Sequence, residues 1–203
     1  MRRAAVVVGT ALSIAVLAGC STQEADPPAP TSSATAAPSP TPTPTPTPSP
    51  SGIVEGSDLE LGIVLDDVPE LGGDDAQVYN WAATYEKEYW RTLTTNAISP
   101  AMSLLASPEL QQRVTTLVQS NVADKWVIDG TMHVRIDSIV VDGDTASAAV
   151  CRDFSDTTAT EDGRALTPEE LGPDLVPKQM TLARVAGEQR WTVLTSETGA
   201  GTC

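Results

Sequence analysis

The spacing of apolar residues predicts that the second half of the chain folds with helices first and strands afterwards. Downstream of Asp74 and Asp75, either of which can cap a helix, apolar residues recur at helical intervals up to about Thr94. This spacing indicates one amphipathic helix, with Trp81 and Trp90 flanking its apolar face. The residues on that face are Val78, Ala82, Tyr85, Tyr89 and Leu93.

Two further helix starts each place a serine before a proline, so that the serine caps the helix and the proline occupies its first turn. They lie at Ser99 and at Ser107. The second start predicts a helix that ends near Val122. Its apolar face comprises Leu110, Val114, Leu117 and Val118.

After Trp126 the period changes from helical to alternating, which predicts strands. In "TMHVRIDSIVV" (131–141), polar residues such as His133 and Asp137 alternate with apolar ones and are expected to point away from the core. The turn "VDGD" carries Asp-Gly, a strong hairpin signal, and leads into "TASAAVCRDF" (145–154).

The remainder of the chain predicts a polar excursion and a final hairpin. Residues 155–177 are polar and contain glycines, prolines and one helical turn at "TPEEL". The segments "KQMTLARV" and "RWTVLTSE" then pair around the turn "AGEQ". Helices followed by four antiparallel strands indicate the α+β class.

The chain begins with Arg2 and Arg3 followed by an uncharged, mostly apolar run. Such a start is typical of a secretory signal, and the run is shorter than the roughly 20 residues that a membrane-spanning helix needs. It ends in "LAGC", which resembles the bacterial lipoprotein signal at all four positions. The resemblance implies that residues 1–19 are removed and that Cys20 carries diacylglycerol. An ordinary signal peptide with an incidental cysteine is the alternative.

Acylation of Cys20, with chains such as palmitate, predicts a partner and a location. Two acyl chains hold a protein on a bilayer, whereas one chain alone holds it only marginally. The membrane is therefore an expected partner through the lipid anchor. The expected location is the extracytoplasmic face of the cell membrane.

The segment that follows the anchor has the composition of a spacer. Residues 20–52 include "PSPTPTPTPTPSPSG", in which alternate prolines exclude both helix and sheet. We expect a disordered, extended tether of about 3.1 Å per residue, with sugars on its threonines as an open alternative to a bare spacer. Residues 53–73 form an acidic arm or linker, in which "LELGIVL" adds an edge strand, packs on the domain or does neither. The folded domain is expected over residues 74–203.

Charge narrows the class of partner. The chain has 27 acidic and 12 basic residues, a formal net charge of −15. Because phosphate recognition needs a basic surface, nucleic acid is excluded as a partner. Ionic attraction to anionic lipids is excluded on the same ground, so any membrane anchor must be the acyl chains. Scarce lysine beside abundant arginine, alanine and threonine is typical of a GC-rich genome such as that of an actinobacterium.

Besides Cys20 the chain has two cysteines, Cys151 and Cys203. An even pair in an exported protein predicts a disulfide between them. A nucleophilic Cys151 would need His133 as its base and would leave Cys203 without a role. A zinc site would lack both ligands and ligand spacing. No metal and no cofactor are therefore expected.

The order of elements resembles the nuclear transport factor 2-like family, also called SnoaL-like or ketosteroid isomerase-like. The resemblance lies in the aromatic first helix "WAATYEKEYW", the run Cys151-Arg152-Asp153, and a last strand that opens with Trp191 before a final cysteine. It implies N-terminal helices packed in a strongly bent antiparallel sheet, forming a cone. An α+β domain of another topology is the alternative.

Catalytic members of that family hold an acid–base pair inside the cone. The candidates here are Tyr85, Tyr89, His133, Asp137 and Asp153, and they do not assemble into a base, a donor and a substrate site. We therefore expect a non-catalytic binding or scaffolding module of the cell envelope, with an envelope protein as partner. The alternatives are a binder of a small apolar ligand or lipid and a ketosteroid isomerase-like enzyme. Five aromatic residues either line a pocket or close the core: Trp81, Tyr85, Tyr89, Trp90 and Trp126.

The lipid anchor is tested by the substitution Cys20→Ala. We expect the variant to lose incorporation of an alkyne-labelled palmitate and to leave the membrane fraction, because the thiol that accepts diacylglycerol is gone. The variant Cys203→Ala is the control and should keep the label. A Cys20→Ala protein that still fractionates with membranes contradicts the lipoprotein interpretation.

Overall fold

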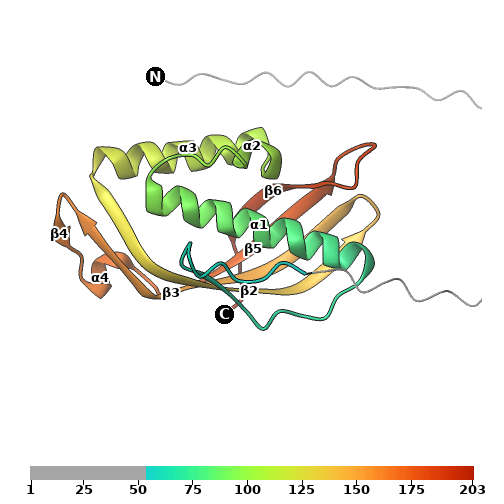
Figure 1. The fold of residues 1–203 in the computed structure, drawn as a ribbon, viewed down its shortest axis with the longest axis horizontal. Helices are drawn as coiled ribbons and strands as arrows, with labels where there is room; N and C mark the ends of the chain where they lie inside the picture. Colours follow the sequence, from blue (N-terminus) through green and yellow to red (C-terminus); the bar gives the residue numbers. More distant parts are fainter. Residues whose placement is uncertain (1–53) are drawn as a thin grey trace, which may run out of the picture. The chain divides into compact units, whose positions relative to one another are not determined.

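The computed structural model describes residues 54–203 (Figure 1). The predicted signal, the acylated Cys20 and the tether over residues 20–52 lie outside the described residues. Within residues 54–203, none of the helices combines the length and the hydropathy that crossing a membrane requires.

From α1 onward the helices and strands follow the expected order, with the short strand β4 as an addition, and the mixed α+β class is confirmed. The helices are α1 (Gly73–Thr95), α2 (Met102–Leu105), α3 (Pro108–Ala123) and α4 (Pro168–Leu171). The strands are β1 (Ile63–Asp66), β2 (Trp126–Asp142), β3 (Thr145–Glu161), β4 (Arg164–Ala165), β5 (Leu175–Arg184) and β6 (Trp191–Thr198).

All six strands belong to one curved, open sheet in the order β1-β2-β3-β5-β6, with β4 paired to β3. The pairs are antiparallel except that β1 runs parallel to β2, with Ile63 opposite Met132. The segment "LELGIVL" thus supplies an edge strand, one of the alternatives left open by the sequence. Its residues Ile63 and Leu65 are buried, so the folded unit begins upstream of residue 74.

The helix ends follow from local chemistry. The N-cap of α1 is Gly72 rather than an aspartate, and Asp74 and Asp75 lie in the first turn, where carboxylates favour the helix dipole. The helix ends at Asn96 in the left-handed conformation, which asparagine tolerates. Ser107 caps α3 as expected, and its hydroxyl accepts a hydrogen bond from the Leu110 amide at 3.2 Å.

The central hairpin is longer than the sequence predicted. β2 already begins at Trp126, and β3 continues to Glu161, into the polar stretch that was expected to leave the sheet. The register shifts twice along this pair, and such bulges bend and twist a strand. Gly130 lies just before the first shift with φ of 109°, and a Cβ there would approach the Asp156 carbonyl oxygen to 2.3 Å. Only glycine fits this bend.

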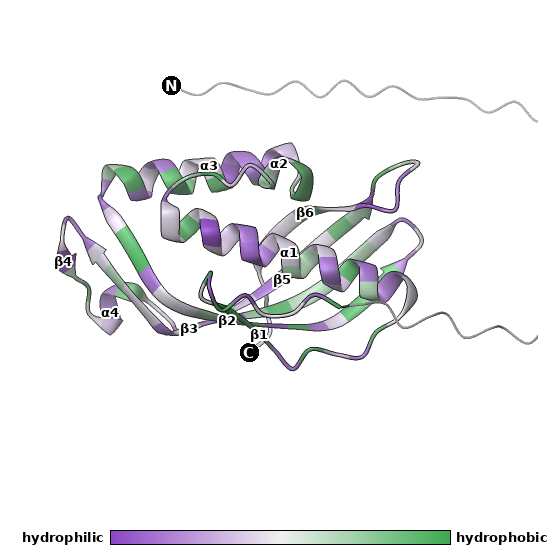
Figure 2. Ribbon diagram, in the orientation of Figure 1, coloured by the Kyte–Doolittle hydropathy of each residue, from purple (hydrophilic) through white to green (hydrophobic). Residues whose placement is uncertain are grey.

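The core lies between α1 and the concave side of the sheet (Figure 1). Hydrophobic and hydrophilic residues alternate along the strands and along α1 (Figure 2). Trp90, expected at the flank of the helix, is instead fully buried, and its Nε1 donates a hydrogen bond to the Leu61 carbonyl oxygen at 3.0 Å. This bond ties α1 to the segment just before β1.

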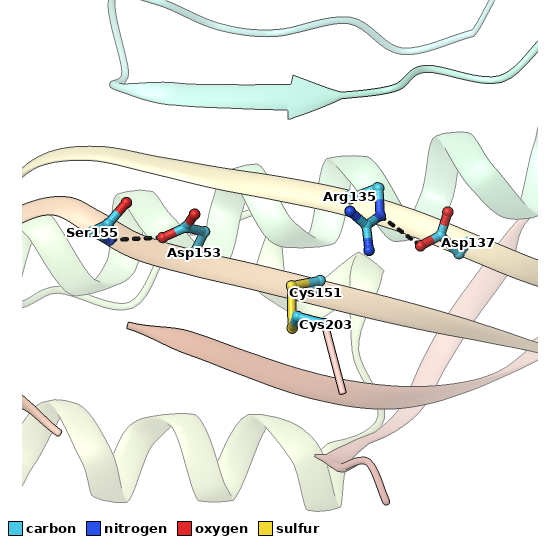
Figure 3. The surroundings of a disulfide bond; sticks show 6 residues. All are labelled: Arg135, Asp137, Cys151, Asp153, Ser155 and Cys203. Carbon is cyan, nitrogen blue, oxygen red and sulfur yellow. Dashed lines mark hydrogen bonds and ion pairs between the residues drawn. A yellow bond between two sulfur atoms is a disulfide. The ribbon is translucent and has the colours of Figure 1, made fainter. Parts of the chain in front are cut away.

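The expected disulfide joins Cys151 to Cys203, with the Cα atoms 5.4 Å apart (Figure 3). Cys151 and Asp153 share the face of β3 turned away from α1. Hydrogen bonds from Ser155, above all from its amide, hold the pKa of Asp153 below its ordinary value. The disulfide therefore fastens the segment after β6 to the outer face of the sheet.

Loss of the disulfide should lower stability. On the chain-entropy account, a bond that spans 52 residues contributes about 4 kcal/mol. We expect the double variant Cys151→Ser/Cys203→Ser to unfold at lower urea concentration than the oxidised protein, and dithiothreitol to leave the variant unchanged. Alkylation of both thiols in native, unreduced protein contradicts the bond.

Candidate functional site

An apolar groove of about 270 Å³ lies between the two long helices and the sheet. Tyr89 and Leu93 come from the last turns of α1, and Leu117 comes from α3. Trp126 and Ile128 come from the start of β2, the part of the strand that the sequence did not predict. The longer β2 therefore forms one wall of the groove.

The opposite wall comes from the polar excursion and its surroundings. Phe154 on β3, Leu171 at the end of α4 and Val176 on β5 line this side, with the chain from Gly172 to Asp174 between them. The short helix α4 is held by a capping box, in which Thr167 and Glu170 satisfy each other's backbone amides. A segment expected to be a plain excursion thus closes the site.

A second cavity of about 230 Å³ adjoins the groove. Tyr89 and Leu117 line both, so the two cavities meet at these side chains. Its own lining is more polar and includes Tyr85, Arg152 and Lys178. The candidate site therefore has an apolar end and a charged end.

The charged end is built around a buried ion pair between α1 and β3. Arg152 Nε and Nη2 donate to the two carboxylate oxygens of Glu86 at 2.7 and 2.8 Å. Glu86 is 0 % exposed and Arg152 is 4 % exposed. The guanidinium also lies 4.1 Å from the centre of the Tyr89 ring, and its Nη2 donates to Ser196 Oγ at 3.4 Å. Two-point geometry of this kind compensates much of the loss of water around both charges.

The surroundings of this pair shift the pKa values of its neighbours. Burial lowers the pKa of Arg152, but Glu86 and the two tyrosines outweigh this effect, so the pKa is raised and the guanidinium stays charged. Burial raises the pKa of Tyr85, whose phenol is therefore neutral at pH 7. Burial, and next the charge of Arg152, lower the pKa of Lys178.

The ion pair between Glu86 and Arg152 was not predicted from the sequence, although the helical and alternating patterns place both residues on inward faces. Glu86 lies four residues after Ala82 on the stripe that faces the sheet, and Arg152 alternates with Cys151 and Asp153 on β3. A charged residue at an inward position of each element was the available signal. Both residues belong to the quoted runs "WAATYEKEYW" and Cys151-Arg152-Asp153.

The structure separates the candidate catalytic residues. His133 lies on the side of the sheet turned away from α1, with Nδ1 3.3 Å from Asp66 and Nε2 3.4 Å from Asp156. Asp137 and Asp153 share this side, and Asp137 accepts a hydrogen bond from Arg135 at 2.8 Å. Tyr85 and Tyr89 lie on the other side, in and near the core.

Of the five aromatic candidates, some line the cavities and others pack in or against the core. The groove is lined by Tyr89 and Trp126, and the adjoining cavity by Tyr85 and Tyr89. Trp90 closes the core, and Trp81 packs against the edge of the core while remaining partly exposed.

No family model matches the chain, and no curated protein sequence matches it. The intermembrane-space region of the chloroplast protein ARC6 aligns with 12 % identity and a TM-score of 0.46, over 66 % of this chain and 100 % of that one. A protein assigned as a ketosteroid isomerase, from Shewanella frigidimarina, aligns with 12 % identity and a TM-score of 0.37, over 59 % and 94 %.

A protein with a SEC-C motif from Rhodopseudomonas palustris aligns with 12 % identity and a TM-score of 0.32, over 64 % of this chain and 78 % of that one. At such TM-scores these likenesses assign neither a family nor a function. Membership of the nuclear transport factor 2-like family stays a prediction.

The buried pair is tested by a double-mutant cycle. Glu86→Leu and Arg152→Met should each lower the free energy of unfolding by about 3–5 kcal/mol, because each leaves an unpaired charge in the core. The double variant should be more stable than either single variant, since it replaces both charges by apolar groups. The free energy of unfolding of the parent protein, the two single variants and the double variant is measured by urea denaturation.

The control for this cycle is Lys125→Met, which removes an exposed ion pair with Asp162. It should change stability by at most about 1 kcal/mol. Effects of Glu86→Leu and Arg152→Met that simply add in the double variant contradict the coupling.

Proposed function

We propose that this protein is a membrane-tethered, non-catalytic binding module on the extracytoplasmic side of the cell envelope. Its ligand site is the groove lined by Tyr89, Leu117 and Trp126. The observation that carries the proposal is the groove itself: a concave, mostly apolar space with a few convergent polar groups at one end.

The size and lining of the site favour a small molecule. Ligand pockets commonly have volumes of roughly 300–1,000 Å³ and apolar walls. The groove and its adjoining cavity, of about 270 and 230 Å³, together fall in that range. Aromatic and aliphatic walls gain free energy by removing apolar ligand surface from water, at about 25 cal/mol per Å².

A binding role is favoured over catalysis by the placement of the titratable groups. General acid–base chemistry needs two such groups within hydrogen-bond reach of one substrate. The sheet separates His133, Asp137 and Asp153 from the groove, and Arg152 is engaged by Glu86. The groups that remain at the groove are suited to holding a ligand.

The lipid anchor and the tether predicted from the sequence support a role at the membrane. A module held by Cys20 on a long spacer can meet ligands that leave the bilayer or the neighbouring envelope. A nearby envelope protein is the natural donor or acceptor of such a ligand.

The groove is tested by filling it. Leu117 is 38 % exposed and lines the groove, so Leu117→Trp should fold and occupy the space. We expect the variant to bind the neutral fluorescent probe N-phenyl-1-naphthylamine at least about tenfold more weakly, equivalent to about 1.4 kcal/mol.

The matched control is Val122→Trp, on the same helix, at a residue that is 57 % exposed and does not line the groove. It should bind the probe as the parent protein does. Equal affinity of the parent and Leu117→Trp would remove the groove as the site.

A further inference from the structure

Lys178 differs from every other arginine and lysine that the structure describes. Each of the other nine between residues 54 and 203 forms an ion pair with an aspartate or glutamate. Lys178 forms none, although acidic residues outnumber basic ones by 27 to 12 in the chain. In so acidic a protein, a lysine without an acidic partner is unexpected, and its position should have a physical reason.

The position of Lys178 is equally unusual. It is partly buried on β5 and lies on the inward face of the strand, between Val176 and Met180. Val176 lines the apolar groove and Lys178 lines the adjoining cavity. The ammonium group is therefore held beside the end of the apolar space, partly withdrawn from water.

The charges around this cavity leave one positive charge uncompensated. Arg152 is neutralised by Glu86, and Arg113 at the rim is neutralised by Glu197. Only the ammonium of Lys178 remains. A partly desolvated charge without a partner is unfavourable, and an anion bound there would remove that cost.

We propose that the site binds a single-chain amphiphile with a monovalent anionic head group, a fatty acid or a close analogue. The acyl chain lies in the groove along Leu117 and Trp126, and the carboxylate lies at Lys178. This inference rests on the proposed function, because it names the chemical class of the ligand for the same groove.

Charge and volume select this class among amphiphiles. The net positive charge of the cavity at Lys178 is matched by one negative charge, whereas a second negative charge in the site is disfavoured by the carboxylate of Asp174, which lines the groove. Cavities of about 270 and 230 Å³ have room for one chain and a small head group rather than for a diacyl lipid. A cationic amphiphile would place two positive charges side by side.

The experiment compares ligands that share a chain and differ in the head group. Decanoate, decan-1-ol and decylamine are titrated by calorimetry into the full chain carrying Cys20→Ala, which has no acyl chains of its own. We expect decanoate to bind at least about tenfold more tightly than decan-1-ol, the gain of one charge-assisted contact. Decylamine should bind most weakly.

Variants assign the preference to Lys178. Lys178→Met keeps the length of the side chain and should lower decanoate affinity about tenfold while leaving decan-1-ol affinity unchanged. Lys178→Arg should retain the preference for decanoate. Lys125→Met, at a lysine whose side chain is 71 % exposed and outside both cavities, should change neither affinity.

The outcomes separate the two proposals. Equal binding of decanoate and decan-1-ol, with no effect of Lys178→Met, overturns the anionic head group and leaves the apolar binding site standing. A preference for decylamine also overturns it. Failure of all three ligands to bind overturns the binding site and with it the inference about Lys178.

Discussion

The bidentate pair between Glu86 and Arg152 is the contact on which the rest of the site depends. It crosses from α1 to β3 through the core and fixes the separation of helix and sheet. The guanidinium also supports the ring of Tyr89, which stands between the groove and the adjoining cavity. Because removal of either partner would leave an unpaired charge in the core, the pair favours the packing of α1 on β3 that keeps the two groups in contact.

The groove forms because the central hairpin of β2 and β3 is long and bent. β2 and β3 extend beyond the end of α1, and the bulge beside Gly130 bends them as they do so. Trp126 and Ile128 thereby line the groove together with Leu117 of α3, and Ile128 also packs against the edge of the core. The excursion between β3 and β5 then closes the far side. The same curvature that completes the core therefore leaves an apolar space beyond it.

The sequence predicted the helices and the inward faces of the strands because these depend on local periodicity. The bounds of α3 agree closely with the spacing from Ser107 to Val122. The extension of β3 was missed because residues 155–161 are polar and gain their strand pairing from β2 rather than from an apolar face. β1 remained undecided, since a parallel strand of four residues is defined by its partner alone.

The candidate site was predicted in part for similar reasons. Tyr89 and Trp126 were recognised by residue type, whereas Lys178 and Arg152 acquire meaning only when α1, α3 and β5 converge. Charged residues are ordinarily assigned to solvent, so an inward arginine or lysine carries a weak signal in one sequence. The pairing of Glu86 with Arg152 spans 66 positions, and no local pattern reports it.

The disulfide also determines where the chain leaves the domain. Cys203 is held against β3 on the face of the sheet opposite the groove, beside Arg135 and Asp137. Anything attached beyond Cys203, whether a fluorophore, an affinity tag or a second domain, departs from that outer face. The sheet then lies between such an attachment and the ligand site. The C-terminal end of the domain is therefore the natural handle for immobilising this protein with its groove unobstructed.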